Sequence, residues 1–135
     1  MILKIVILSL LLISTGVASS DYPSGIVTWV EDGDTFEVQD FGLVSLSQVD
    51  SPEMGTIEGV HVREFALERL LNVVVFLDKD DSASINADGS ILCLVYLSGP
   101  NGKPNLNKSF NKMIVEAGFA VIKNDTKSEF DPALW

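Results

Sequence analysis

The sequence predicts a β-rich α+β domain built on a five-stranded OB-type Greek-key barrel with two or three helices. Three short segments rich in β-branched residues follow one another closely between residues 24 and 49, which is typical of an antiparallel meander. An amphipathic helical segment comes next, followed by two more strand-like segments and a second helical segment. This order does not suit a doubly wound parallel sheet, in which strands and helices alternate, whereas a small closed barrel accommodates it.

The composition indicates one globular domain. The chain has 135 residues, and 47% of them are hydrophobic, which is enough to form a single core. The formal net charge of −10 disfavours a polyanionic partner such as nucleic acid. The single cysteine, Cys93, excludes an intramolecular disulfide and a cysteine-based structural zinc site. Its apolar neighbours predict that it is a small buried side chain.

Residues 1–20 have the three regions of a secretory signal peptide. Lys4 supplies the positive charge, residues 5–13 are apolar, and small residues lead to a cleavage point after Ala18 or Ser20. The apolar run is short for a bilayer core of about 30 Å, which favours cleavage over stable membrane insertion. We therefore expect an exported protein whose mature domain comprises residues 21–135.

The first half of that domain contains the meander. Residues 24–30 alternate in hydrophobicity and predict a strand, and the turn at 31–34 contains an Asp-Gly pair that supplies a tight bend. Residues 35–38 form the second predicted strand, residues 39–42 turn the chain back, and residues 43–49 form the third. The three strands are expected to pair in sequence order.

The second half supplies the helices and the remaining strands. Apolar residues from Val62 to Leu71 recur at helical spacing and predict a helix of about three turns. Two strands are expected at 72–77 and 90–97, joined by an acidic loop that we interpret as solvated. Residues 106–117 predict a second helix that ends at Gly118.

Two acidic motifs flank the third predicted strand. If the second and third strands pair as a hairpin, Asp34 at the start of one and Asp50 at the end of the other come together at one mouth of the barrel. Two carboxylates, a backbone carbonyl and water would make a partial site for calcium, with Glu53 placed to act as a general base. The alternative is that both motifs are ordinary turn signals.

The order of these motifs resembles the staphylococcal nuclease-like (thermonuclease) family. The resemblance rests on Val-Glu-Asp-Gly-Asp-Thr-Phe-Glu-Val at 30–38 and on Val-Ser-Leu-Ser-Gln-Val-Asp-Ser-Pro-Glu at 44–53. It continues in the Asp-Gly pair at 88–89 and in the segment 111–120, and it covers residues 24–122. It implies a five-stranded barrel and calcium-dependent hydrolysis of phosphodiesters in DNA and RNA. Nucleic acid or nucleotides are then the candidate partners, and no feature identifies a protein partner.

The resemblance also implies roles for particular residues. Asp34 and Asp50 match the two calcium carboxylates, and Ser51 matches the residue whose backbone carbonyl binds the ion. Glu53 matches the general base, so that it is the implied catalytic residue. No bound cofactor other than calcium is implied.

The chain departs from the family pattern at the phosphate-binding arginines. The two arginine positions are Ser45 and Ser90, and loss of one such preorganised donor costs about 10²–10³ in rate. The tyrosines that usually follow the Gly-x-Ala segment are also missing, with Lys123 in that region. Arg63, on the first predicted helix, is the candidate for a substitute phosphate clamp, with a lysine as the other possibility.

Three hypotheses follow. The first is an exported thermonuclease-like domain that keeps its calcium site, has weak or no nuclease activity and serves as a binding module. The second is an active calcium-dependent phosphodiesterase in which Glu53 is the base and Arg63 or a lysine holds the phosphate. The third is a structural barrel whose acidic motifs are only turns.

Overall fold

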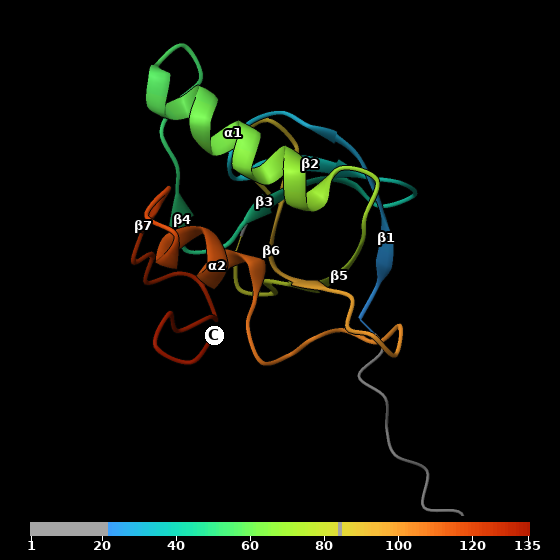
Figure 1. The fold of residues 1–135 in the computed structure, drawn as a ribbon. Coiled ribbons are helices and arrows are strands. Elements are labelled where there is room, and N and C mark those ends of the chain that lie inside the picture. The colour runs from blue at the N-terminus through green and yellow to red at the C-terminus, as the bar shows by residue number, and fades with distance from the viewer. Residues whose placement is uncertain (1–21, 84) are drawn as a thin grey trace, which may run out of the picture.

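Five strands close into a barrel in the computed structural model, which describes residues 22–83 and 85–135 (Figure 1). The signal peptide predicted for residues 1–20 lies outside the described residues. The barrel strands are β1 (Ser24–Val30), β2 (Thr35–Val38), β3 (Gly42–Leu46), β5 (Val74–Lys79) and β6 (Ile91–Leu97). Their order around the barrel is β1-β2-β3-β6-β5, and β5 pairs with β1 to close it.

The pairing of the strands confirms the predicted fold class. β1, β2 and β3 form the antiparallel meander, with Thr35 opposite Ser45 between β2 and β3. β3 then pairs in parallel with β6, while β5 is antiparallel to both β6 and β1. The result is a β-rich α+β fold with an OB-type barrel and two helices, α1 (Ile57–Leu70) and α2 (Phe110–Glu116).

The third and fourth barrel strands differ in extent from the predictions. β3 ends at Leu46 rather than at residue 49, because Gln48 has a left-handed backbone with φ of 63° that cannot continue a strand. The chain resumes as the short strand β4 (Val49–Asp50), which pairs with β7 (Val121–Ile122) in a separate two-stranded sheet. In the same way, the left-handed Asn72 delays the start of β5.

Helix α1 begins earlier than the predicted Val62. Thr56 caps its N-terminus, and the Thr56 hydroxyl accepts a hydrogen bond from the Gly59 N–H at 3.0 Å. Gly59 lies inside the helix, and only glycine fits there because a Cβ would collide with the backbone carbonyl of Glu53. The glycine therefore marks a close approach of two backbone segments and not a loop.

Helix α2 is shorter than the predicted segment 106–117. Ser109 is its N-cap, and the Ser109 hydroxyl accepts from the Lys112 N–H at 3.1 Å. The residues before Ser109 are irregular. Gly118 lies just beyond the helix with a left-handed φ of 81°, as predicted for a C-terminal stop.

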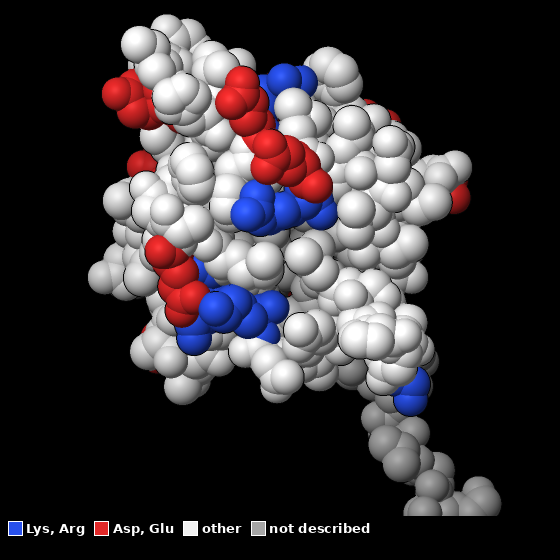
Figure 2. Space-filling model, viewed as in Figure 1, with Lys and Arg blue, Asp and Glu red and all other residues white. Residues whose placement is uncertain are grey.

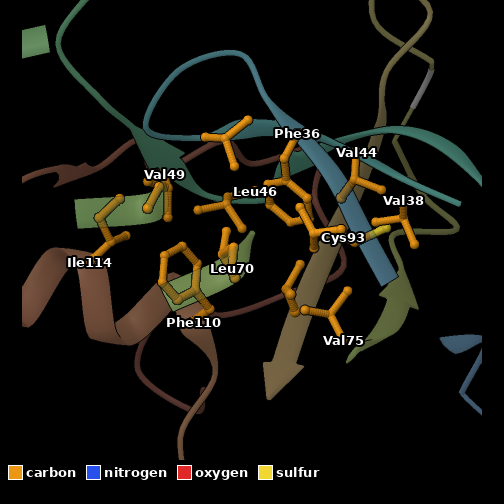
Figure 3. Close-up of a cluster of buried hydrophobic side chains, with 14 of the residues drawn as sticks. Phe36, Val38, Val44, Leu46, Val49, Leu70, Val75, Cys93, Phe110 and Ile114 are labelled. Carbon is orange, nitrogen blue, oxygen red and sulfur yellow. The ribbon is translucent and has the colours of Figure 1, made fainter. Parts of the chain in front are cut away.

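The core occupies the inside of the barrel and the space between the barrel and both helices (Figure 3). Phe36, Leu46 and Val75 are barrel residues, whereas Leu70 and Phe110 come from α1 and α2, and all five are buried. Cys93 is fully buried in the same cluster, as predicted. Burial raises the pKa of the Cys93 thiol to about 12, so that it is an unreactive core side chain at neutral pH.

Acidic and basic side chains are mixed on the face that carries the two helices. Figure 2 shows them interspersed there, with no continuous basic surface on this face. Lys108 and Lys112 both lie within ion-pair distance of Glu116, at 2.6 and 3.9 Å. Neither helix in the described part of the chain is long and apolar enough to cross a bilayer.

The acidic loop is not solvated throughout, contrary to the prediction. Asp80 is only 1% exposed and lies at the end of β5, beside the C-terminal segment. Its carboxylate accepts hydrogen bonds from the hydroxyls of Ser47 and Ser128 and from the backbone N–H groups of Ser82 and Glu129. Asp80 is therefore a structural residue, which joins the β3–β4 turn to the end of the chain.

Candidate functional site

A polar cavity of about 110 Å³ lies where β2 begins and where β3 runs into β4. Three parts of the chain build it: the meander together with β4, the loop before β6 together with the start of β6, and the C-terminal segment after β7. Its polar lining consists of Asp34, Ser45, Ser47, Gln48, Asp50, Asn86, Lys123, Asp125 and Ser128. This volume is small compared with the roughly 300–1,000 Å³ of pockets that hold drug-sized ligands.

The structure brings Asp34 and Asp50 to this one cavity, as predicted, although Asp50 lies in β4 and not at the end of the β2–β3 hairpin. Asp34 immediately precedes β2, and its carbonyl oxygen accepts from the Leu46 N–H at 2.8 Å, which extends the β2–β3 ladder. Beyond the Gln48 bend, β4 places Asp50 on the same cavity. The Ser51 N–H donates to Asp34 Oδ2 at 3.2 Å, so the two acidic motifs are in direct contact.

The carboxyl of Asp34 is electrostatically perturbed. Burial, together with a hydrogen bond to and repulsion by the Asp32 carboxyl, raises the pKa of Asp34 to about 6 from an ordinary value of 3.8. The Ser51 N–H and the Thr35 hydroxyl oppose this rise by donating to the Asp34 carboxylate. A cation in the cavity would favour the charged form of Asp34 and relieve the cost of burying it.

Gly33 allows this turn to lie against helix α1. The Asp-Gly pair was predicted to supply a tight bend, but Gly33 is not among the described glycines that have a positive φ. A Cβ at Gly33 would lie 2.6 Å from Val62 Cγ2 and 3.1 Å from Ser51 Oγ. A larger residue would push the turn away from α1, and Asp34 with it.

Ser45 in β3 and Ser90, directly before β6, lie within hydrogen-bond distance of each other; the resemblance to the nuclease family placed arginines at these two positions. Ser45 Oγ donates to Ser90 Oγ at 2.9 Å, and both residues are buried, with exposures of 8% and 0%. Ser45 Oγ also lies 3.1 Å from Thr35 Oγ1, and Ser90 Oγ accepts from Asn86 Nδ2 at 2.9 Å. These hydroxyls are satisfied within the protein, and neither provides a positive charge.

The other predicted site residues lie apart from the cavity lining. Glu53 is exposed in the loop between β4 and α1 and is not among the residues that line the cavity. Arg63 Nε donates to the carbonyl of Val30 at 3.1 Å, and its guanidinium lies over the Trp29 ring at 5.5 Å. Arg63 does not line the cavity either.

The donors in the cavity suit a hard cation, although the protein supplies few of them. Asp34, Asp50 and Asp125 line the cavity, and carboxylate oxygens are the donors that calcium takes. Within residues 22–83 and 85–135, no group of three or more His, Cys, Asp or Glu converges closely enough to hold a metal alone. Water or a ligand would have to complete the coordination.

The C-terminal segment also lines the cavity, which was not predicted from the sequence. Gln48 Oε1 accepts from the Asp125 N–H at 2.7 Å, while Nε2 donates to the carbonyls of Asp125 and Phe130, both at 2.9 Å. This buried side chain fixes the segment that places Lys123 and Asp125 on the cavity. A lone glutamine between two strands carries no sequence signal for such a contact.

No protein-family model matches this chain, and no curated protein matches it. The geometry of the cavity is therefore the main guide to what the protein does.

Proposed function

We propose that this protein is an exported, divergent thermonuclease-like barrel that binds calcium and serves as a binding module, with weak or no phosphodiester hydrolysis. The observation that carries the proposal is the composition of one cavity. Asp34 and Asp50 both line it, while the two positions expected to hold arginines form the buried Ser45–Ser90 pair. Export is supported by Lys4 and the apolar run that follows it.

Asp34 and Asp50 would hold the ion, with water completing its coordination. Bound calcium would supply positive charge to an oxygen of an anionic ligand. The Ser51 N–H keeps the Asp34 carboxylate oriented by donating to Oδ2, and Thr35 donates to Oδ1 at 3.1 Å. Both donors are backbone or adjacent groups, so the carboxylate is positioned before any ligand arrives.

Weak hydrolysis is expected because no arginine in the described part of the chain lines the cavity. A phosphodiester transition state spreads negative charge over the phosphate oxygens, and fixed positive groups stabilise it. The Ser45–Ser90 pair is neutral and already hydrogen-bonded. Arg63 is engaged with Val30 and Trp29. Glu53 lies outside the cavity lining, so a water held by the ion has no neighbouring base from that residue.

A calcium titration by calorimetry tests the proposal. The protein is expected to release or absorb heat on binding calcium, and Asp34→Ala is expected to weaken the affinity at least tenfold, because half of the carboxylate pair is lost. Asp81→Ala is the matched control, since Asp81 is an exposed acidic residue outside the cavity. Absence of heat in the unaltered protein, or equal affinity in Asp34→Ala, would instead support a structural barrel whose acidic motifs are turns.

An active calcium-dependent phosphodiesterase is the second candidate, favoured by one observation: a cation, Lys123, lines the same cavity. Cleavage of fluorogenic DNA and RNA, with calcium or with a chelator, separates the two candidates. We expect cleavage at least 10²-fold slower than an arginine-containing site would give. Efficient cleavage that requires calcium, and that Glu53→Gln removes, would overturn the binding role and establish the second candidate.

A further inference from the structure

Lys123 holds a distinct position in the cavity. It directly follows β7, and its N–H donates to the Gln48 carbonyl at 2.9 Å, which extends the β4–β7 pairing by one residue. Among the described residues that line the cavity, Lys123 is the only lysine or arginine. The side chain is exposed, and it forms no ion pair within 4.0 Å in the described part of the chain.

The backbone around Lys123 is fastened on both sides. The β4–β7 pairing holds the residues before Lys123. After it, Asp125 is held by two hydrogen bonds to Gln48, one from the Asp125 N–H to Oε1 and one from Nε2 to the Asp125 carbonyl. Lys123 differs from Lys108 and Lys112, which both form ion pairs with Glu116. Lys123 therefore carries an exposed ammonium, which can donate three hydrogen bonds, on a stretch of backbone that lines the cavity and is held by hydrogen bonds.

The charges around Lys123 suggest what it would bind. Asp34, Asp50 and Asp125 line the cavity, and a divalent cation would neutralise two of these three charges. An anion that coordinates the cation would then meet the ammonium of Lys123. A tetrahedral phosphate group suits both partners, and the cavity of about 110 Å³ has room for an ion and one such group.

We propose that Lys123 binds the phosphate group of the ligand and replaces, from the C-terminal segment, the positive charge missing at Ser45 and Ser90. The inference rests on the proposed calcium-binding function. It places the ligand's phosphate beside Lys123, where the C-terminal segment lines the cavity. The ligand class is then a small phosphate ester and not a long polyanion, in keeping with the net charge of −10.

Titration of phenyl phosphate, followed by NMR in the presence of calcium, tests this role. The protein is expected to bind the probe, and Lys123→Gln is expected to weaken binding at least about tenfold, the effect of losing one charge-assisted hydrogen bond. Lys123→Arg should restore most of the affinity. Lys127→Gln is the control, because it removes the same charge from an exposed residue of the same segment that does not line the cavity.

The outcomes separate this inference from the proposed function. Calcium binding by Lys123→Gln should be unchanged or slightly tighter, since a like charge is removed. Calcium binding with equal phenyl phosphate affinity in Lys123→Gln and Lys127→Gln would overturn the role of Lys123 and leave the proposed function standing. Failure of the unaltered protein to bind calcium would overturn the proposed function, and the inference with it. Tighter binding of diphenyl phosphate than of phenyl phosphate would assign a diester ligand to the same lysine.

Discussion

Replacing Asn111 by alanine is expected to lower the free energy of unfolding by about 3–4 kcal/mol. Asn111 is fully buried, and its amide joins α2 to the barrel. Oδ1 accepts from the Val95 N–H at 2.9 Å, while Nδ2 donates to the carbonyls of Ser47 and Cys93 at 2.9 and 3.0 Å. Alanine would remove this partner from the Val95 N–H and from the Ser47 carbonyl, at about 1–3 kcal/mol each, whereas the Cys93 carbonyl would keep its hydrogen bond from the Ser47 N–H.

Urea unfolding, followed by tryptophan fluorescence, measures this loss. Asn107→Ala is the matched control, because Asn107 is exposed and its side chain makes no hydrogen bond among the described residues. The control should unfold within about 0.5 kcal/mol of the unaltered protein. A loss below 1 kcal/mol for Asn111→Ala would show that the amide does not fasten α2 to the barrel.

Replacing Asp80 by alanine is expected to detach the C-terminal segment and to cost about 2–3 kcal/mol. The Asp80 carboxylate accepts four hydrogen bonds, two of which come from Ser128 and Glu129 of that segment. Amide exchange in residues 125–130 should become markedly faster, because the segment loses its two hydrogen bonds to Asp80, although Gln48 and Ser47 still contact it. Exchange in the barrel strands should change much less.

The effect of Asp80 depends on pH in a definite direction. Burial raises the pKa of its carboxyl, but the hydrogen bonds from Ser128, Glu129, Ser82 and Ser47 outweigh this and hold the pKa below the ordinary 3.8. Because the folded pKa is lowered, the stabilisation is present above pH 3.8 and is lost as the pH falls through the folded value.

Two measurements check the Asp80 prediction. The difference between Asp80→Ala and the unaltered protein should be full at pH 7 and should shrink in strong acid. Asp81→Ala, at the exposed neighbouring position, should show neither the loss nor the faster exchange. Unchanged exchange at residues 125–130 in Asp80→Ala would mean that the remaining contacts, from Gln48 and Ser47, retain the segment without Asp80.

Only part of the candidate site could be predicted from the sequence. The convergence of Asp34 and Asp50 was predictable because Asp34 directly precedes β2, whose register with β3 depends on a short turn, and Asp50 follows the end of β3 by only four residues. Lys123 and Asp125 reach the same cavity through Gln48, which is 77 residues away from Asp125. No local pattern records a contact across that separation.

The buried polar residues show the same limit. Asp80 stands among acidic loop residues, and its neighbours predict a solvated side chain. The structure buries it because Ser128, 48 residues further along the chain, supplies a hydrogen-bond partner. Gly59 precedes the predicted helix, yet it lies in α1, where the backbone of Glu53 passes too close for any side chain.

The sequence by itself determined the barrel and the two helices. Strand and helix periodicities are local, and the short turns between the first three strands leave one practical way to pair them. Tertiary structure alone decided which polar groups are buried, that Lys123 lines the cavity, where β3 ends and where α1 begins. Those features depend on hydrogen-bond partners and close contacts contributed by distant segments, and a buried polar group is stable only where such a partner is present.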